Sequence, residues 1–238
     1  MLLRLPTSVS EAQRCLAEGA VPIGGATLVW AGWQRDGFPE YAMSLRELPE
    51  ATAIGRETLG AAVVLHQIDD RVPETLRRAA ATVGTGAVRR TATVGGNMAG
   101  STLRCLLPAA LVLEARALVL EPDDMYETEP AEVPAKGRLL LGLRWREPLA
   151  SRYRKLPGAA GGAPPLVVAA ALHAADGGGS RLRVAVRVGY DVLCESVDRA
   201  AGSTAEQVLD ALHGTTAGAL DAPAWDVVRA EVTGLLAR

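Results

Sequence analysis

Aromatic side chains are scarce in this sequence. They make up 4% of the 238 residues, and there is a single phenylalanine, Phe38. A core built from this chain must therefore consist mainly of Leu, Val and Ala. Long apolar runs are lacking as well, because the best candidate, residues 106–120, is interrupted by Glu114 and Arg116. The sequence predicts neither a membrane span nor a signal peptide, so we expect a cytoplasmic protein with no membrane partner.

Cysteine and an excess of charge of one sign are also lacking. The three cysteines, Cys15, Cys105 and Cys194, lie far apart, which excludes a disulfide framework and the spacing of a zinc or iron–sulfur site. We therefore expect three reduced thiols and no metal site. The formal net charge of -2 predicts no basic surface, so no nucleic-acid partner is expected.

Short helical and strand patterns alternate along the chain. Residues 8–19 are typical of a helix, with a capping box at Ser8 and Glu11 and a glycine at the end. Further helices are predicted from Pro73, from Leu106, and over residues 203–212 and 224–236. Strands are predicted at residues 20–23, 41–45, 51–54, 57–65, 117–120, 139–145 and 166–173.

Three stretches are interpreted as loops or turns. Residues 121–136 are acidic and contain two prolines, which predicts a surface loop. Residues 159–165 are rich in Gly and Pro and are predicted to be mobile. A hairpin turn is expected at residues 176–179, followed by residues 181–188, where apolar residues alternate with Arg181, Arg183 and Arg187. That alternation predicts a half-buried antiparallel strand with the arginines on its polar face.

Two glycine pairs are the main candidates for a binding site. They lie in Ile23-Gly24-Gly25-Ala26-Thr27-Leu28 and in Thr93-Val94-Gly95-Gly96-Asn97. Glycine is favoured where the backbone passes close to a neighbour or where φ is positive. Two such turns can present N–H groups to one anion such as a pyrophosphate, although each pair alone also fits an ordinary β-turn. The spacing of the Rossmann fingerprint is absent, which excludes that type of nucleotide site.

The second glycine pair has flanks that resemble a known family. Arg89 to Ala99, followed by Leu106 to Leu111, resembles the flavin-binding subunit or domain of molybdenum hydroxylases, which include the carbon monoxide dehydrogenase medium subunit and the xanthine dehydrogenase FAD domain. Pro22 to Leu28, Leu59 to Ala61 and Tyr153 to Leu156 are similar to other parts of that family, in the same order.

The resemblance implies an α+β fold. It predicts a two-subdomain FAD-binding domain of the PCMH/vanillyl-alcohol-oxidase type over residues 1–148, with subdomains at about 1–55 and 56–148. A small α+β C-terminal domain of the carbon monoxide dehydrogenase flavoprotein type is expected at residues 149–238.

The same resemblance implies FAD as the cofactor, with its pyrophosphate on the two glycine turns. Backbone N–H groups at both turns are the expected donors, and Asn97 and Ser101 are expected to add side-chain hydrogen bonds. Lys155 matches a family lysine near the flavin ring, and Leu140 matches an apolar contact to that ring. The candidate cofactor-binding residues are Ile23, Gly24, Gly25, Ala26, Thr27, Leu28, Thr93, Val94, Gly95, Gly96, Asn97, Ser101, Cys105, Leu140 and Lys155.

The sequence departs from the family pattern at several positions. Cys105 stands where the family has an Asp that helps to hold the cofactor, and the first glycine loop and the Arg89-Arg90 pair also differ. Cys105 is interpreted as a small buried apolar residue, with a redox thiol as the alternative.

Three functions remain open from the sequence. The first is an FAD-binding oxidoreductase subunit that passes electrons between a partner redox centre and NAD or another acceptor, with iron–sulfur and molybdopterin subunits as partners. The second is a stand-alone FAD-dependent dehydrogenase or oxidase that uses NAD(P)H or a small-molecule substrate. The third is a scaffold that has lost FAD. No catalytic residue is assigned, and the uncommitted acid–base candidates are His66, His173, His213, Tyr153 and Tyr190.

Overall fold

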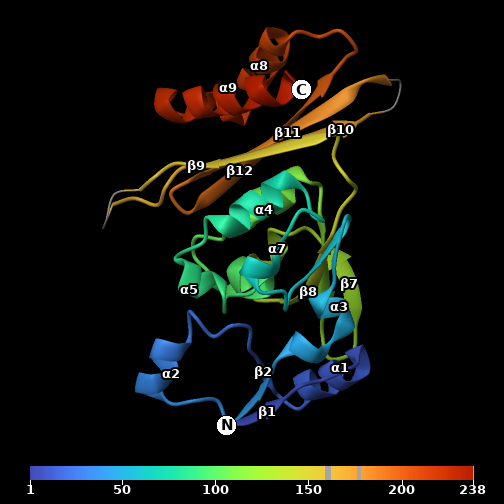
Figure 1. Cartoon of the computed structure of the whole chain (residues 1–238), viewed down its shortest axis with the longest axis vertical. Helices are drawn as coiled ribbons and strands as arrows, with labels where there is room; N and C mark the ends of the chain where they lie inside the picture. The colour runs from blue at the N-terminus through green and yellow to red at the C-terminus, as the bar shows by residue number, and fades with distance from the viewer. Residues whose placement is uncertain (159–161, 176–177, 238) are drawn as a thin grey trace.

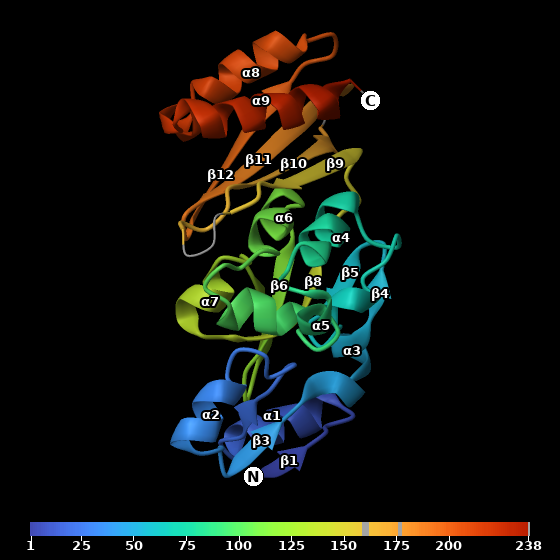
Figure 2. The ribbon, with the colours of Figure 1, turned by 60° about the vertical axis from the view of Figure 1, so that its left-hand side comes forward.

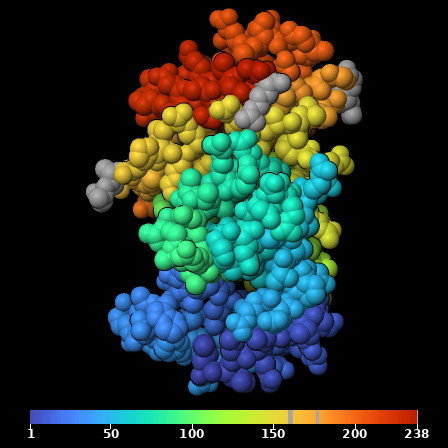
Figure 3. Space-filling model, viewed as in Figure 1, coloured from blue at the N-terminus to red at the C-terminus, as the bar shows by residue number. Residues whose placement is uncertain are grey.

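The computed structural model describes residues 1–158, 162–175 and 178–237 of the chain. These residues form three units stacked along the long axis of the molecule, which appear as successive colour bands in Figures 1 and 3. The residues predicted to be mobile and the predicted hairpin turn lie partly outside the described ranges. Within those ranges, every helix is too short or too polar to cross a membrane.

The N-terminal unit contains a small parallel sheet in which β1 and β2 both pair with β3. The predicted first helix is confirmed as α1, whose N-cap residue Ser8 accepts a hydrogen bond from the Glu11 N–H. Its buried residues Ala12 and Cys15 pack with Met43 and Leu48. The elements are β1 (Leu2–Arg4), α1 (Val9–Ala17), β2 (Val21–Pro22), α2 (Trp30–Asp36), β3 (Tyr41–Met43), η1 (Leu45–Glu47) and α3 (Pro49–Thr52).

The central unit is a five-stranded sheet in the order β4-β5-β8-β6-β7, with every pairing antiparallel. Helices α4, α5 and α6 lie between this sheet and the C-terminal unit or beside it (Figure 2). The elements are β4 (Ile54–Gly55), β5 (Thr58–Gly60), η2 (Leu65–Gln67), α4 (Glu74–Ala81), α5 (Gly86–Arg89), the π-helix η3 (Gly96–Gly100), α6 (Leu107–Val112), β6 (Arg116–Leu120), β7 (Met125–Thr128), α7 (Glu132–Lys136) and β8 (Leu139–Arg144).

The C-terminal unit is an antiparallel sheet covered on both faces. One face contributes Val167, Ala169 and Ala185 to the core of the central unit. The other face packs against α8 and α9, where Trp225 and Val228 are buried. The sheet order is β12-β11-β10-β9. The elements are β9 (Ala150–Lys155), β10 (Val167–Ala174), β11 (Ser180–Val188), β12 (Asp191–Arg199), α8 (Ala205–His213), η5 (Thr216–Ala219) and α9 (Ala222–Leu236).

Several local predictions were wrong, although the α+β class is confirmed. Of the strand predicted at residues 51–54, only Ile54 lies in a strand, β4. Ala51 and Thr52 belong to α3, because Pro49 at the first helical position starts a turn that ends at Thr52. The strand predicted at residues 57–65 is limited to Thr58–Gly60. The stretch predicted as a surface loop at residues 121–136 contains β7 and α7. Strand β7 forms because it pairs with β6. Helix α7 is attached to the core by Val133, which is fully buried.

The strand β11 also departs from its predicted pattern. Arg181 and Arg183 are at least partly exposed, as the alternation predicted, but Ala185, Val186 and Arg187 are all buried. The far end of β11 is buried on both faces because the sheet is covered by helices on each side. Arg187 is therefore a core residue, and its placement on a polar face was wrong.

Candidate cofactor site

The first glycine loop connects β2 to α2 and leaves a run of backbone donors free. In Figure 1 this segment rises from the N-terminal unit toward the central unit. The N–H groups from Gly24 to Leu28 have no hydrogen-bond acceptor in the part of the chain that the structure describes. The loop is fixed on either side by the Ile23 N–H, which donates to Met43, and by the Trp30 N–H, which donates to Ala26.

The second glycine segment is tied to the central sheet. The Val94 N–H donates to the Val63 carbonyl at 3.0 Å, and the Gly95 N–H donates to the Ala61 carbonyl at 2.8 Å. The Gly96 N–H donates to the hydroxyl oxygen of Thr93 at 3.2 Å. The N–H groups of Gly95 and Gly96 thus already have acceptors, which leaves the first loop as the main source of free donors.

The structure brings the two glycine segments into direct contact. A Cβ added to Gly25 would lie 1.7 Å from the carbonyl oxygen of Thr91, and one added to Gly24 would lie 2.4 Å from Thr93 Oγ1. Side chains at these positions would push the loops apart, because real Cβ atoms do not approach other atoms so closely. The requirement for glycine here is therefore close approach, as one of the two sequence arguments stated.

Positive φ, the other argument for glycine, occurs at different residues. Gly95 has φ of -59°, in the right-handed helical region. Ala26 has φ of 54° and Arg104 has φ of 39°, and both lie in loops that carry candidate site residues. Non-glycine residues rarely adopt this conformation, and such strain tends to gather at binding sites.

Asn97 and Ser101 occupy the start and the end of a segment that leads away from the glycine loops. Asn97 is 5% exposed, and its Oδ1 accepts a hydrogen bond from the Leu106 N–H at 3.0 Å. This bond fixes the approach to α6. Ser101 follows the π-helix directly and is partly exposed. An irregular π-helix at this place is typical of functional sites.

A pocket of about 860 Å³ opens where this segment meets the C-terminal unit. Lys155, at the end of β9, lines the pocket, and its Nζ donates to the Thr82 carbonyl at 2.9 Å. Tyr190, which is 60% exposed and lies at the turn between β11 and β12, also lines the pocket. The lining residues are Thr82, Thr102, Leu103, Lys155, Leu156, Pro157, Gly158, Gly162, Ala163, Pro164, Pro165 and Tyr190.

Cys105 and Leu140 are buried rather than open to the pocket. Cys105 is 2% exposed, and its Sγ lies 3.6 Å from Arg187 Nη1. The environment fits the interpretation of Cys105 as a small buried residue. Leu140 is 1% exposed and pairs with Val119 inside the sheet of the central unit.

The acid–base candidates do not converge. His173 is buried and donates from Nε2 to the Val112 carbonyl at 2.7 Å, and His213 packs edge-on against Trp225. His66 lies in η2, at another part of the central unit. Burial raises the pKa of Tyr153 to about 12, so its hydroxyl stays protonated at neutral pH. Of the acid–base candidates, only Tyr190 lines the pocket.

The pocket also contains residues that the sequence did not single out. Thr82 follows α4, Thr102 and Leu103 follow the π-helix, and Pro165 precedes β10. These residues come from separate elements that approach one another only in the folded chain. No pattern along the sequence joins them.

The residues present fit a dinucleotide cofactor. Consecutive free N–H groups in a glycine loop suit a phosphate group, since each donor needs an acceptor and the loop backbone is accessible there. The chain from Thr93 to Leu103 connects this loop to the pocket that holds Lys155. The arrangement thus offers an anion-binding end and a larger pocket with one amine.

Several solved structures share the fold of this chain, among them two CO dehydrogenases and a quinoline oxidoreductase. Cu,Mo-CO dehydrogenase in its cyanide-inactivated form is 18% identical, with a TM-score of 0.70, covering 99% of this chain and 96% of that one. Quinoline 2-oxidoreductase from Pseudomonas putida 86 is 17% identical, with a TM-score of 0.69, covering 98% and 93%. Reconstituted CO dehydrogenase from Oligotropha carboxidovorans is 22% identical, with a TM-score of 0.67, covering 98% and 85%.

A family profile makes the assignment from sequence. A comparison with curated proteins finds no match. The profile described as "FAD binding domain in molybdopterin dehydrogenase" matches residues 3–136, which is more than half of the chain. The expected fold and the predicted resemblance are both confirmed. The chain belongs to the family of FAD-binding domains in molybdopterin dehydrogenases, with FAD as its cofactor, and is therefore part of an FAD-dependent oxidoreductase.

Proposed function

We propose that this chain holds FAD between its glycine loops and the pocket at Lys155, and passes electrons between a partner redox centre and NAD or another acceptor. The observation that carries the proposal is the run of free N–H groups from Gly24 to Leu28, packed against the second glycine segment. FAD, when bound, accepts or releases electrons singly or in pairs. The chain supplies the position and the electrostatic environment.

The first loop binds the pyrophosphate in this proposal. Each hydrogen bond from a backbone N–H to a charged phosphate oxygen contributes about 1.5–3 kcal/mol. The loop needs little reorganisation, because Ala26 is already held in its strained conformation by hydrogen bonds from Val29 and Trp30. Binding therefore uses a backbone that is ordered in advance.

Lys155 places a positive charge in the pocket. Its Nζ is held by the carbonyl of Thr82, so the amine has a defined position at the pocket wall. Among the described lining residues, no acidic side chain opposes it. The amine favours negative charge on a group bound beside it.

The partner redox centres are proposed to be iron–sulfur and molybdopterin subunits. The family description, which names molybdopterin dehydrogenases, and the Cu,Mo-containing CO dehydrogenase of the same fold support the molybdopterin partner. The iron–sulfur partner follows from the family resemblance. We expect a tagged chain purified from its own cells to bring molybdenum and iron with it. A chain that is isolated alone and reduced directly by NAD(P)H would instead support a stand-alone dehydrogenase.

The test of FAD binding is to add FAD to the apoprotein and measure how much flavin stays bound during gel filtration. We expect wild-type protein to retain flavin through gel filtration, with the usual flavin absorbance at about 450 nm. Gly25→Ala should abolish binding, because its new Cβ would collide with the backbone of Thr91. Gly86→Ala is the matched control, since the nearest atom would lie 3.9 Å away. Flavin retained by a folded Gly25→Ala protein would overturn the placement.

A further inference from the structure

Arg187 is a buried cation without an ion-pair partner. Its side chain is 0% exposed and is among the largest fully buried side chains of the molecule. Two other arginines of the same strand, Arg181 and Arg183, lie near Glu114 or Asp198. Within the described ranges, no carboxylate lies within ion-pair distance of Arg187, and its Nε has no partner.

A guanidinium remains charged under all physiological conditions, so this burial costs free energy. The cost is offset only in part by neutral acceptors. Arg187 Nη1 donates to the Leu103 carbonyl and lies 3.6 Å from Cys105 Sγ, while Nη2 donates to the Pro165 carbonyl at 2.8 Å. A cation kept under these conditions calls for a reason other than stability.

The two carbonyl groups belong to two separate chain segments that line the pocket, which we call its two walls. Leu103 lies in the loop between the π-helix and α6, and Pro165 lies in the segment before β10. Arg104 follows Leu103 in the first of these segments, and its φ of 39° is a strained conformation that surrounding contacts must hold. The Arg187 guanidinium thus donates to both walls without itself lining the pocket.

We propose that Arg187 is a positioning residue for the cofactor pocket, which holds the loop of Leu103 and Cys105 against Pro165 and so fixes the spacing of the two walls. The proposal rests on the proposed FAD site. Arg187 itself does not line the pocket, so it acts through the two backbone segments that do.

Two substitutions separate the role of the two hydrogen bonds from the role of the positive charge. Arg187→Met keeps much of the buried volume and removes all donors. Arg187→Lys keeps the cation, but a single amine cannot repeat the planar two-pronged contact with both carbonyls. Arg181→Met is the matched control, because it removes an arginine from the same strand at a partly exposed position.

The first measurement is the affinity of each apoprotein for FAD, with folding checked by circular dichroism. We expect Arg187→Met to bind about tenfold more weakly or worse, since the pocket is no longer held in its binding arrangement. Arg187→Lys should lie between that variant and wild type, and Arg181→Met should match wild type. Unchanged affinity and unchanged visible circular dichroism of bound flavin in Arg187→Met would overturn the proposal.

The second measurement needs no flavin. In a background with Cys15→Ala and Cys194→Ala, the remaining thiol of Cys105 is 2% exposed and should react slowly with a disulfide reagent. Release of its loop in Arg187→Met should raise the rate about tenfold or more, because local opening controls access. Arg181→Met should leave the rate unchanged.

The two measurements distinguish the proposals. Equal thiol rates in wild type and in Arg187→Met would show that Arg187 does not hold the loop, whatever happens to flavin. If wild type bound no FAD, the proposed function would fail, and the thiol rates would still decide whether Arg187 holds the loop. If Arg187→Met does not fold, Arg187→Lys carries both comparisons.

Discussion

At Gly24, a single side-chain atom of the second glycine segment, Thr93 Oγ1, leaves no room for a Cβ. The Cβ added by Gly24→Ala would lie 2.4 Å from Thr93 Oγ1, but 3.6 Å and 3.7 Å from the next two atoms. We expect Gly24→Ala to weaken FAD binding by about tenfold, or ~1.4 kcal/mol. Combining it with Thr93→Ala should restore most of the affinity, because the colliding oxygen is gone.

Gly100→Ala serves as the control for this pair of substitutions. It adds a methyl group to the π-helix that follows Thr93, at an ordinary contact distance of 3.5 Å from Leu28. Thr93→Ala alone reports the loss of the hydrogen bond from the Gly96 N–H. A double variant that binds no better than Gly24→Ala would show that the loops are not separated by this contact.

At the level of residues, close approach was one of two reasons for glycine that the sequence left open, and the contact between the two segments was not predicted. Close packing at Gly24 and Gly25 follows from a general property of glycine, and the structure confirms it. The positive φ at Ala26 was not predictable, because alanine carries no preference for that conformation. Arg187 is buried because helices pack over both faces of its sheet. The alternation of residues along one strand cannot predict that packing.

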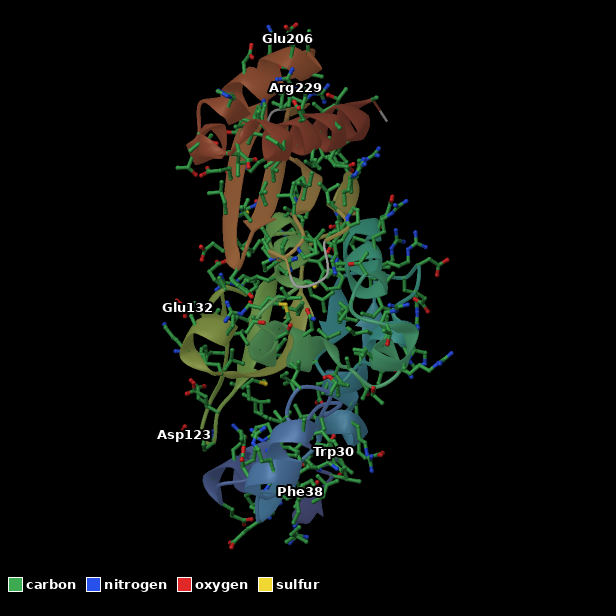
Figure 4. The ribbon with its side chains drawn as sticks, turned by 90° about the vertical axis from the view of Figure 1, so that its left-hand side faces the viewer. Trp30, Phe38, Asp123, Glu132, Glu206 and Arg229 are labelled. Atoms are coloured by element: carbon green, nitrogen blue, oxygen red, sulfur yellow. The ribbon has the colours of Figure 1, made fainter. Side chains whose placement is uncertain are left out.

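At the level of elements, long amphipathic segments were predicted well and short ones were not. The predicted apolar face of α9, with Trp225, Val228 and Val232, is buried as expected. Helices α3 and α7 have four and five residues, too few for a periodic pattern to emerge. Helix α2 was missed as well; none of its residues is buried, and its Trp30 lies near Phe38 on the N-terminal unit (Figure 4).

Helix α9 is attached to the sheet by a buried ion pair as well as by its apolar face. Glu231 is 5% exposed and accepts a hydrogen bond from Arg152 Nε at 3.1 Å, with Arg154 at 3.5 Å. Both arginines belong to β9. We expect Glu231→Gln to lower the free energy of unfolding by about 2 kcal/mol, between the values for fully buried and exposed pairs.

The measurement is urea denaturation followed by circular dichroism. Asp226→Asn is the control, since Asp226 lies on the same helix and is exposed. The outer face of α9, which carries Arg229, points away from the sheet in Figure 4. Equal unfolding midpoints for Glu231→Gln and Asp226→Asn would show that the ion pair contributes no net stability.

At the level of the whole molecule, the C-terminal sheet is a shared layer. Its one face completes the core of the central unit, and its other face carries α8 and α9. Polar contacts join the same units, including the bond from Lys155 to Thr82 and that from His173 to Val112. The predicted boundary at residues 148–149 stays a prediction, and the shared core argues that the two parts depend on each other for stability.

Tyr153 lies within this shared core and should make the molecule sensitive to alkaline pH. Its hydroxyl is 3.4 Å from Thr82 Oγ1, and burial raises its pKa to about 12, against about 10 in an unfolded chain. The folded state therefore keeps a proton that the unfolded state loses above pH ~10. The stability contributed by neutral Tyr153 is complete below that pH and falls as the pH rises toward about 12, by about 3 kcal/mol.

The measurement is the unfolding midpoint in urea across this alkaline range for wild type and for Tyr153→Phe. We expect the wild-type midpoint to fall more steeply, because phenylalanine has no proton to lose. Tyr41, whose pKa is also raised, is present in both proteins, so the difference between them reports Tyr153 alone. Tyr190→Phe, at a position 60% exposed, should follow the wild-type curve. Parallel curves for Tyr153→Phe and wild type would mean that Tyr153 ionises without separating the C-terminal sheet from α4, and that the shared core tolerates a charge at this position.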